Sequence, residues 1–93
     1  ENEDPSVPAL AHALGYSRTS LYRKIKSLTG MSINQFARSV RIKKAAELLS
    51  SSTTMTVSEI AFSLGFTDLK YFRQCFKDQF HILPSDYQRK SGI

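Results

Sequence analysis

Side chains that can form hydrogen bonds with the edges of DNA bases recur at helical spacing in two stretches of the sequence. The first stretch carries Thr19, Arg23 and Lys26, and the second carries Lys70, Gln74 and Lys77. An arginine can donate two parallel hydrogen bonds to guanine, and a glutamine can pair in the same way with adenine. These are the residue types that reading a DNA major groove requires.

Each stretch sorts into two faces when its residues are placed about 100° apart around a helix. The polar side chains lie opposite apolar faces that consist of Leu21, Ile25 and Leu28 in the first stretch and of Phe72, Phe76 and Phe80 in the second. One polar outer face is weak support for binding, because amphipathic helices have such faces whether or not they bind anything. Two basic faces on repeated segments are stronger support.

Charge is distributed unevenly along the 93-residue chain, which has 13 Lys and Arg against 8 Asp and Glu and a net charge of +5. No acidic residue lies between Asp4 and Glu47, an interval that holds eight basic residues. Residues 1–50 have a net charge of +4, and residues 51–93 have +1. The pattern indicates an anionic partner. We expect the first half to supply most of the attraction to phosphate.

The sequence has no constellation typical of an enzyme. It contains no Cys–His or Ser–His–Asp arrangement at suggestive spacing, no glycine-rich phosphate loop and no metal-binding cluster. The single cysteine, Cys75, borders the phenylalanine face, where we expect a small core residue. No apolar run approaches the roughly 18–20 residues of a membrane span. We therefore expect no catalytic residue, no metal and no cofactor.

Two other binding functions fit the sequence less well than DNA binding. A protein-interaction bundle would place apolar groups on the outward faces, where this chain has mostly Lys, Arg, Gln and Thr. Modules that read single-stranded RNA display aromatic residues on strands or loops, and no strand pattern is present. Double-stranded DNA is the partner that the residue pattern favours.

The chain contains an internal repeat. Residues 7–15, VPALAHALG, align with residues 57–65, VSEIAFSLG, at an offset of 50, which becomes 51 after the glycine. Each copy predicts two helices joined by a tight turn, the arrangement of a helix-turn-helix. The apolar stripes of the two leading helices are Leu10, Ala11 and Leu14 in the first copy and Ile60, Ala61 and Leu64 in the second.

Capping residues mark the expected helix ends. Glycine can take the left-handed conformation that ends a helix, and we expect this of Gly15, Gly30 and Gly65. Ser17 is a good N-cap for the helix after the first turn, and Thr67 or Asp68 is the corresponding cap in the second copy.

A third segment, from Ser32 to about Leu49, predicts one long helix between the copies. Its apolar residues follow helical spacing and are Ile33, Phe36, Ala37, Val40, Ala45, Leu48 and Leu49. Eighteen residues give a rod of about 27 Å, comparable with the repeat of about 34 Å between successive major grooves. One chain could therefore read two successive turns of DNA.

The expected fold is all-α and forms one DNA-binding domain with three parts. These are a first helix-turn-helix at residues 1–31, a linker helix at 32–50, and a second helix-turn-helix with a terminal short helix at 51–93. Residues 50–56, SSSTTMT, are the only linker-like stretch, and Pro84 begins the terminal helix.

Several motifs resemble the signature of the AraC/XylS family of bacterial transcription regulators. They are AAELL at residues 45–49, GFTD at 65–68, PSDY at 84–87 and GYSRTSLYRKIK at 15–26. The resemblance runs from about Ser6 to Arg89 and implies two helix-turn-helix units that bind DNA to regulate transcription, with RNA polymerase as a partner of the parent protein. The motifs are most similar to the DNA-binding tails of two-component regulators, including hybrid sensor kinases.

This resemblance implies that the chain is the output domain of a larger signal-responsive protein, without the helix that normally precedes the first unit. We expect the isolated domain to be monomeric, because each chain already holds two reading helices. We expect a cytoplasmic, nucleoid-associated location, with a membrane anchor and a kinase in the parent if it is a hybrid sensor.

Positions carried over from the family assign the DNA contacts. The implied base contacts are Thr19, Ser20, Tyr22 and Arg23 in the first recognition helix and Leu69, Lys70, Tyr71, Arg73 and Gln74 in the second. The predicted phosphate contacts are Ser17, Arg18, Lys26, Arg38, Thr67 and Lys77. Burial as packing residues is an equal alternative for Tyr22 and Tyr71. Arg38 and Arg41 could instead pair with Glu47 or the linker helix, and a structural role is favoured for Arg41.

The sequence departs from the family pattern at three positions. Gln74 stands where arginine is common, which removes the usual guanine-reading residue from the second helix. His81 replaces a glycine, and Leu83 replaces a serine or threonine before Pro84. These two changes affect the turn rather than the function, and histidine tolerates a left-handed conformation better than most residues.

Overall fold

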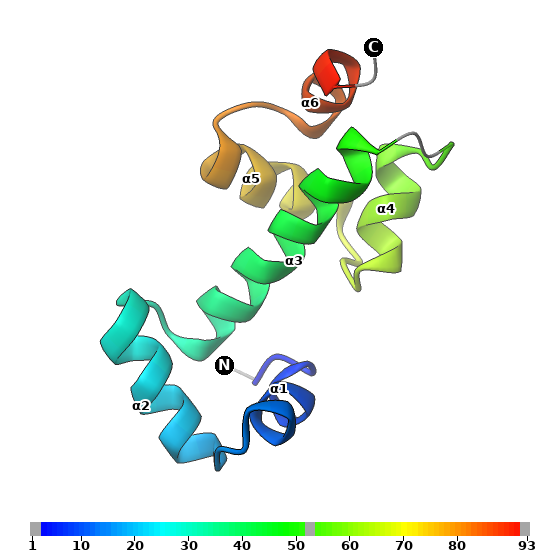
Figure 1. The fold of residues 1–93 in the computed structure, drawn as a ribbon. Helices are drawn as coiled ribbons and strands as arrows, with labels where there is room; N and C mark the ends of the chain where they lie inside the picture. Colours follow the sequence, from blue (N-terminus) through cyan, green and yellow to red (C-terminus); the bar gives the residue numbers. More distant parts are fainter. Residues whose placement is uncertain (1–2, 52–53, 92–93) are drawn as a thin grey trace. The chain divides into compact units, whose positions relative to one another are not determined.

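The computed structural model describes residues 3–51 and 54–91, and within them the chain is entirely helical between its turns. The six helices are α1 (Val7–Leu14), α2 (Arg18–Thr29), α3 (Ile33–Ser50), α4 (Val57–Ser63), α5 (Leu69–Phe80) and α6 (Pro84–Ser91) (Figure 1). The predicted all-α class is confirmed. Part of the predicted linker at 50–56 lies outside the described residues. No helix in the described ranges is long and apolar enough to cross a membrane.

The chain divides after Val40 into two compact units. The first, residues 1–40, contains α1, α2 and the beginning of α3, and the second, residues 41–93, contains the remainder of the chain. The division falls within α3 because the two ends of this helix contribute side chains to different cores. Ile33 belongs to the core of the first unit, and Ile42 belongs to that of the second.

The first unit has a small core in which α1, α2 and the start of α3 meet. Its buried members are Val7, Ala11, Leu21, Ile25 and Ile33, and Leu10 and Phe36 pack against them. Leu21 and Ile25 lie one helical turn apart, so both point to the same side of α2. Their burial fixes which side of α2 faces solvent.

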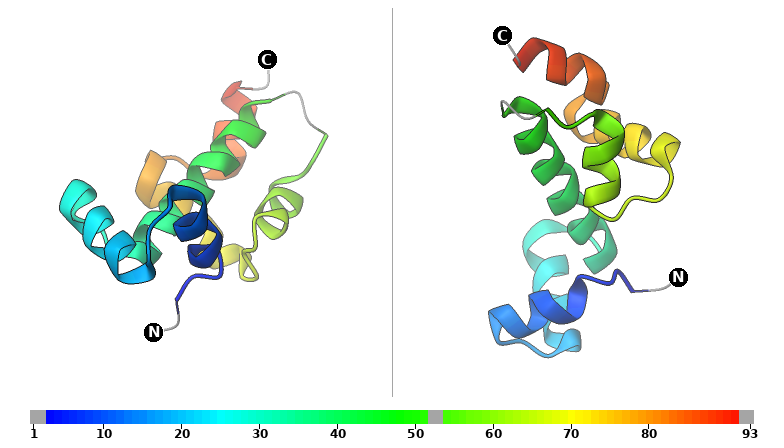
Figure 2. Two further views of the ribbon diagram at one scale, coloured as in Figure 1. Left: turned by 60° about the horizontal axis from the view of Figure 1, so that its bottom comes forward. Right: turned by 90° about the vertical axis from the view of Figure 1, so that its right-hand side faces the viewer.

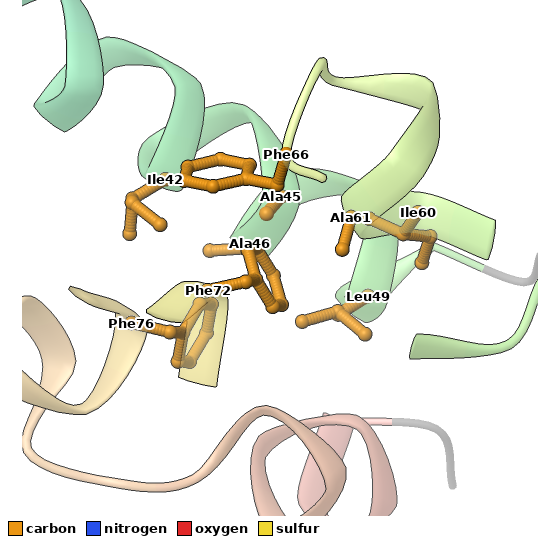
Figure 3. Close-up of a cluster of buried hydrophobic side chains, with 9 residues drawn as sticks. All are labelled: Ile42, Ala45, Ala46, Leu49, Ile60, Ala61, Phe66, Phe72 and Phe76. Atoms are coloured by element: carbon orange, nitrogen blue, oxygen red, sulfur yellow. The ribbon is translucent and has the colours of Figure 1, made fainter. Parts of the chain in front are cut away.

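The second unit has a larger, aromatic core (Figure 3). Its buried members are Ile42, Ala45, Ala46 and Leu49 of α3, Ile60 and Ala61 of α4, Phe66 of the turn, and Phe72 and Phe76 of α5. Small alanines on α3 leave room for the phenylalanine rings, so large and small side chains interdigitate. Phe76 also contacts Tyr87 of α6, with ring centroids 5.5 Å apart, which attaches the last helix to this unit. The course of the backbone through α6 can be followed in Figure 2.

The expected caps are present at α2 and α5. The Oγ atom of Ser17 accepts a hydrogen bond from Ser20 N at 3.2 Å. Asp68, rather than Thr67, caps α5, because its carboxylate accepts from the backbone N–H groups of Lys70 and Tyr71. His81 takes the left-handed conformation expected of it, with φ of 64°.

The internal repeat is reproduced in backbone geometry. Both α2 and α5 have 12 residues, and their bounds differ by the offset of 51. In the first turn, Tyr16 N donates to the carbonyl of Ala11 at 3.0 Å, and in the second Phe66 N donates to that of Ala61 at 3.1 Å. The duplicated sequence therefore encodes two turns that make the same backbone hydrogen bond to the preceding helix.

Three of the apolar residues that follow the predicted helical spacing are exposed. Leu28 is 73% exposed, Leu14 is 52% exposed and Val40 is 50% exposed, so the assignment of Leu14 and Leu28 to buried apolar faces was wrong. Leu28 belongs to neither of the two buried clusters. Val40 lies on α3 between the residues that enter the first core and those that enter the second.

Candidate nucleic-acid interface

The outward side of α2 carries the predicted base-contacting residues of the first unit. Thr19, Ser20, Tyr22 and Arg23 are all exposed, while Leu21 and Ile25 on the opposite side are buried. Burial of the apolar pair sets the rotation of the helix about its own axis. Four of the side chains named from the sequence are therefore brought together on one accessible helical face.

The outward side of α5 presents the corresponding set in the second unit. Lys70, Tyr71, Arg73 and Gln74 are exposed, and the fully buried Phe72 and Phe76 lie behind them. The fifth predicted member, Leu69, is half-buried and packs against the core. Leu69 is therefore the least accessible member of the set, and only part of its side chain could contact a ligand.

Tyr22 and Tyr71 are 36% and 46% exposed. The ring of Tyr71 packs against that of Phe66, with centroids 6.3 Å apart, and the hydroxyl of Tyr22 donates a hydrogen bond to Glu3. Each tyrosine is therefore partly covered by the chain and partly accessible to a ligand.

The two helix N-termini differ electrostatically. A helix N-terminus favours an anion, because its first backbone N–H groups and its dipole present positive charge. The cap of α2 is the neutral hydroxyl of Ser17, whereas the cap of α5 is the carboxylate of Asp68. A phosphate approaching α5 meets the negative charge of its cap, which the neutral cap of α2 does not present.

Some predicted contacts already have partners within the chain. Lys26 Nζ donates to the carbonyl of Gly30 at 2.9 Å, and Gln74 Nε2 donates to Asp78 Oδ1 at 2.8 Å. Each of these bonds uses one N–H group, and Lys26 and Gln74 both have further donors for a DNA ligand. The remaining predicted phosphate contacts are the exposed Ser17, Arg18, Thr67 and Lys77 and the half-buried Arg38.

Arg41 supports the turn of the second unit, in agreement with the structural role favoured for it. Its guanidinium carbon lies 5.5 Å from the centroid of the Phe66 ring, a cation–π arrangement. Phe66 in turn packs edge-on against Phe72 at the start of α5, with centroids 5.1 Å apart. The arginine therefore stabilises the segment that orients the second recognition helix.

Two acidic residues near the interface were missed by the sequence analysis. Asp78 accepts a hydrogen bond from Gln74. The sequence could have predicted this pair, because side chains four residues apart on a helix are neighbours. Glu3 contacts Arg18 and the hydroxyl of Tyr22. Nothing in the sequence pattern connects Glu3 with residues so far along the chain, because only folding brings them together.

The described residues offer no competing catalytic or metal-binding arrangement. None of their polar or charged side chains is buried. No group of three or more His, Cys, Asp and Glu within the described ranges could hold a metal ion. The exposed, mostly polar faces of α2 and α5 are thus the features that a ligand would meet.

Comparison with known proteins identifies the family. A family profile described as a helix-turn-helix domain matches residues 10–90. The C-terminal domain of AraT, a response regulator from Geobacillus stearothermophilus, superimposes with a TM-score of 0.73 at 34% identity, covering 97% of this chain and 74% of that one. The chain belongs to the AraC-type helix-turn-helix family. The AraC-type domain is a DNA-binding domain of transcription regulators, which agrees with the exposed faces of α2 and α5.

Curated relatives of this AraC-type domain are much longer proteins. It is 40% identical over 89 residues to histidine kinase P4 of Formosa agariphila, covering 96% of the chain but 6% of that protein. It is 34% identical over 87 residues to the HTH-type transcriptional regulator MtrA of Neisseria gonorrhoeae, covering 94% of the chain and 29% of that regulator. The chain therefore spans only a small part of the relatives that it matches.

Proposed function

We propose that α2 and α5 are recognition helices that read two successive major-groove segments of promoter DNA. The observation that carries this proposal is the exposure of Arg23 and its neighbours directly opposite the buried Leu21 and Ile25. The equivalent face of α5 supports it, because duplicated units suit a site with two parts. The length of α3, 18 residues, agrees with the helix expected between two such units.

The proposed contacts divide into base-reading and phosphate-binding residues. Base contacts come from Thr19, Ser20, Tyr22 and Arg23 of α2 and from Leu69, Lys70, Tyr71, Arg73 and Gln74 of α5. Phosphate contacts come from Ser17, Arg18, Lys26, Arg38, Thr67 and Lys77. Phosphate contacts hold the protein in register, and base contacts carry the sequence preference.

Selection of bound sites from random duplex DNA, followed by footprinting, tests the proposal. We expect a selected motif with two protected segments about one helical turn apart. Protection of a single segment would contradict the role of the second helix. The absence of any enriched sequence would contradict base reading altogether.

Replacing Arg23 by alanine tests the central base contact. We expect Arg23→Ala to weaken binding to the selected duplex by about 1–3 kcal/mol and to relax the preference at one base pair. Lys24→Ala is the matched control, because Lys24 is an exposed basic residue of the same helix that is not among the proposed contacts. Equal weakening toward all sequences would identify Arg23 as a phosphate contact instead.

We further propose that the chain is the output domain of a larger, signal-responsive bacterial regulator of the two-component type, acting on DNA in the cytoplasm. The similarity to a response-regulator domain and to part of a histidine kinase supports this. A kinase, a membrane anchor and contact with RNA polymerase would belong to the parent protein. The isolated domain is proposed to be monomeric, which sedimentation of residues 1–93 with and without DNA would test.

A further inference from the structure

The segment before α1 places a carboxylate against the proposed DNA-binding face of α2. The Oε2 atom of Glu3 accepts a hydrogen bond from the hydroxyl of Tyr22. Its other oxygen, Oε1, lies 3.4 Å from Nε of Arg18. Tyr22 is a proposed base contact and Arg18 a proposed phosphate contact, so one acidic side chain engages two groups that DNA would use.

Neighbouring hydrogen bonds hold this segment in place. Asp4 N donates to Oδ1 of Asn34 on α3 at 2.8 Å. The Oδ1 atom of Asp4 accepts from both N and Oγ of Ser6, at 2.9 and 2.7 Å. These bonds connect the residue beside Glu3 to α3 and to the start of α1. The position of Glu3 is therefore part of the folded first unit.

The exposed fractions of the Glu3 and Arg18 side chains would allow a DNA phosphate to replace Glu3 as the partner of Arg18. The Glu3 side chain is only 24% exposed, whereas that of Arg18 is 62% exposed. The carboxylate is thus largely covered by the unit, while the guanidinium remains accessible to a second anion. Carboxylate and phosphate oxygens are both charged acceptors for the same guanidinium donors. A phosphate that approaches Arg18 must displace Glu3 or bind against its negative charge.

We propose that Glu3 competes with DNA for Arg18 and Tyr22 and thereby sets the affinity of the first unit for DNA. This inference rests on the proposed function, because it assumes that the face of α2 binds DNA. Every duplex presents phosphates, so competition at Arg18 weakens binding to any sequence. Glu3 therefore limits non-specific binding to DNA as well as specific binding.

The primary test is Glu3→Gln in the chain of residues 1–93. Glutamine has nearly the same shape and keeps an oxygen that can accept from Tyr22, but it has no charge. We expect affinity for the selected duplex and for an unrelated duplex to rise about two- to fivefold at low salt, the range for one exposed ion pair. The log–log salt slope should become steeper by up to about 0.9, as if one phosphate contact were gained.

Glu47→Gln is the matched control for net charge. Glu47 pairs with Lys44 at 3.7 Å, and both side chains are exposed, so this variant also removes one charge from an exposed ion pair. We expect a smaller gain in affinity than from Glu3→Gln. Equal gains from the two variants would overturn the proposal, because net charge alone would then explain the effect.

A double-mutant cycle with Arg18→Ala tests whether Glu3 changes DNA affinity through Arg18. In the Glu3→Gln background, Arg18→Ala should remove the gain in affinity, so that the double variant binds no more tightly than the natural chain. Weaker binding by Glu3→Gln would overturn the proposal, because Glu3 would then help to position the binding face. Thermal unfolding of each variant by circular dichroism checks that the fold is retained.

Failure of this inference and failure of the proposed function give different results. If the natural chain shows neither sequence preference nor salt-dependent binding, the proposed function fails. If it binds specifically but Glu3→Gln binds no more tightly, only the competition is excluded.

Discussion

Gln74 and Arg23 occupy equivalent positions, one in each recognition helix, at the offset of 51 that relates the two helices. Arginine matches guanine and glutamine matches adenine, so the two halves of a DNA site should differ at this position. The bond from Gln74 Nε2 to Asp78 holds the amide on the helix surface in the absence of DNA. The second N–H group and the oxygen of the amide remain for pairing with adenine.

Replacing Gln74 by arginine should therefore change the sequence that the second helix prefers. We expect Gln74→Arg to shift the preference toward guanine at one base pair of the second half-site, by about 1–3 kcal/mol. Selection of bound sites by the natural and variant chains in parallel measures the shift. An unchanged motif would show that Gln74 does not read a base.

The ends of the helices depend on single residues whose effect is conformational. Gly30 ends α2 with a φ of +75°, and a methyl group added at its Cα would meet no atom within 4 Å. A substitution there would thus change backbone strain without creating a steric clash.

Gly30→Ala should lower the free energy of unfolding by about 1 kcal/mol, because a Cβ atom disfavours the left-handed conformation. Gly30→Asn should cost less, since asparagine adopts this conformation more readily. Urea unfolding of both variants measures the difference. Equal losses would mean that something other than the left-handed backbone is responsible.

The apolar residues of α2 illustrate how packing, rather than periodicity, decides burial. Leu21 is fully buried, whereas Leu28 is largely exposed although it lies on the same predicted stripe. The repeat contained a hint of this, because the position equivalent to Leu28 in α5 is Gln79, a polar residue.

Alanine substitutions should separate these two leucines clearly. We expect Leu21→Ala to destabilise the fold by about 2–5 kcal/mol, as deletion of a core side chain does. Leu28→Ala should stay within about 0.5 kcal/mol of the natural chain. Chemical unfolding monitored by circular dichroism gives both values, and a large loss from Leu28→Ala would contradict its exposure.

The two structural units divide the net charge of the chain differently from the two sequence ranges 1–50 and 51–93. With the boundary after Val40, the first unit has five bases and three acids, a net charge of +2, and the second has eight and five, or +3. Arg41, Lys43, Lys44 and Glu47 account for the change, because together they carry a net charge of +2 and belong to the second unit. The expectation that the first unit dominates phosphate attraction therefore loses its basis in net charge.

Lys26 and Lys77, which occupy equivalent positions in α2 and α5, test how the units share this attraction. We expect Lys26→Ala and Lys77→Ala each to make the log–log salt slope of DNA binding shallower by about 0.9. Fluorescence anisotropy with a labelled duplex over a range of salt concentrations measures both slopes. A change confined to Lys26→Ala would restore the first unit as the dominant phosphate-binding part.

Much of this fold could be predicted because its signals are local or repeated. Gly15 and Gly30 end α1 and α2, and Ser17 and Asp68 cap α2 and α5, through contacts within a few residues along the chain. The internal repeat supports the prediction further, because both copies carry the pattern of a helix, a glycine turn and a second helix. The outward faces of α2 and α5 followed from helical periodicity alone, and the structure exposes nearly all of the residues named on them.

The sequence by itself determined the helices, their caps, the two turns and the residue types on each outward face, because these depend on neighbours along the chain. The tertiary structure alone decided which apolar residues are covered, as Leu28 shows, because burial depends on which other elements pack against a helix face. It also decided which charges meet. Glu3 lies beside Arg18 and Tyr22 only because the segment before α1 is tied to α3, and such contacts between distant residues leave no periodic pattern in a sequence.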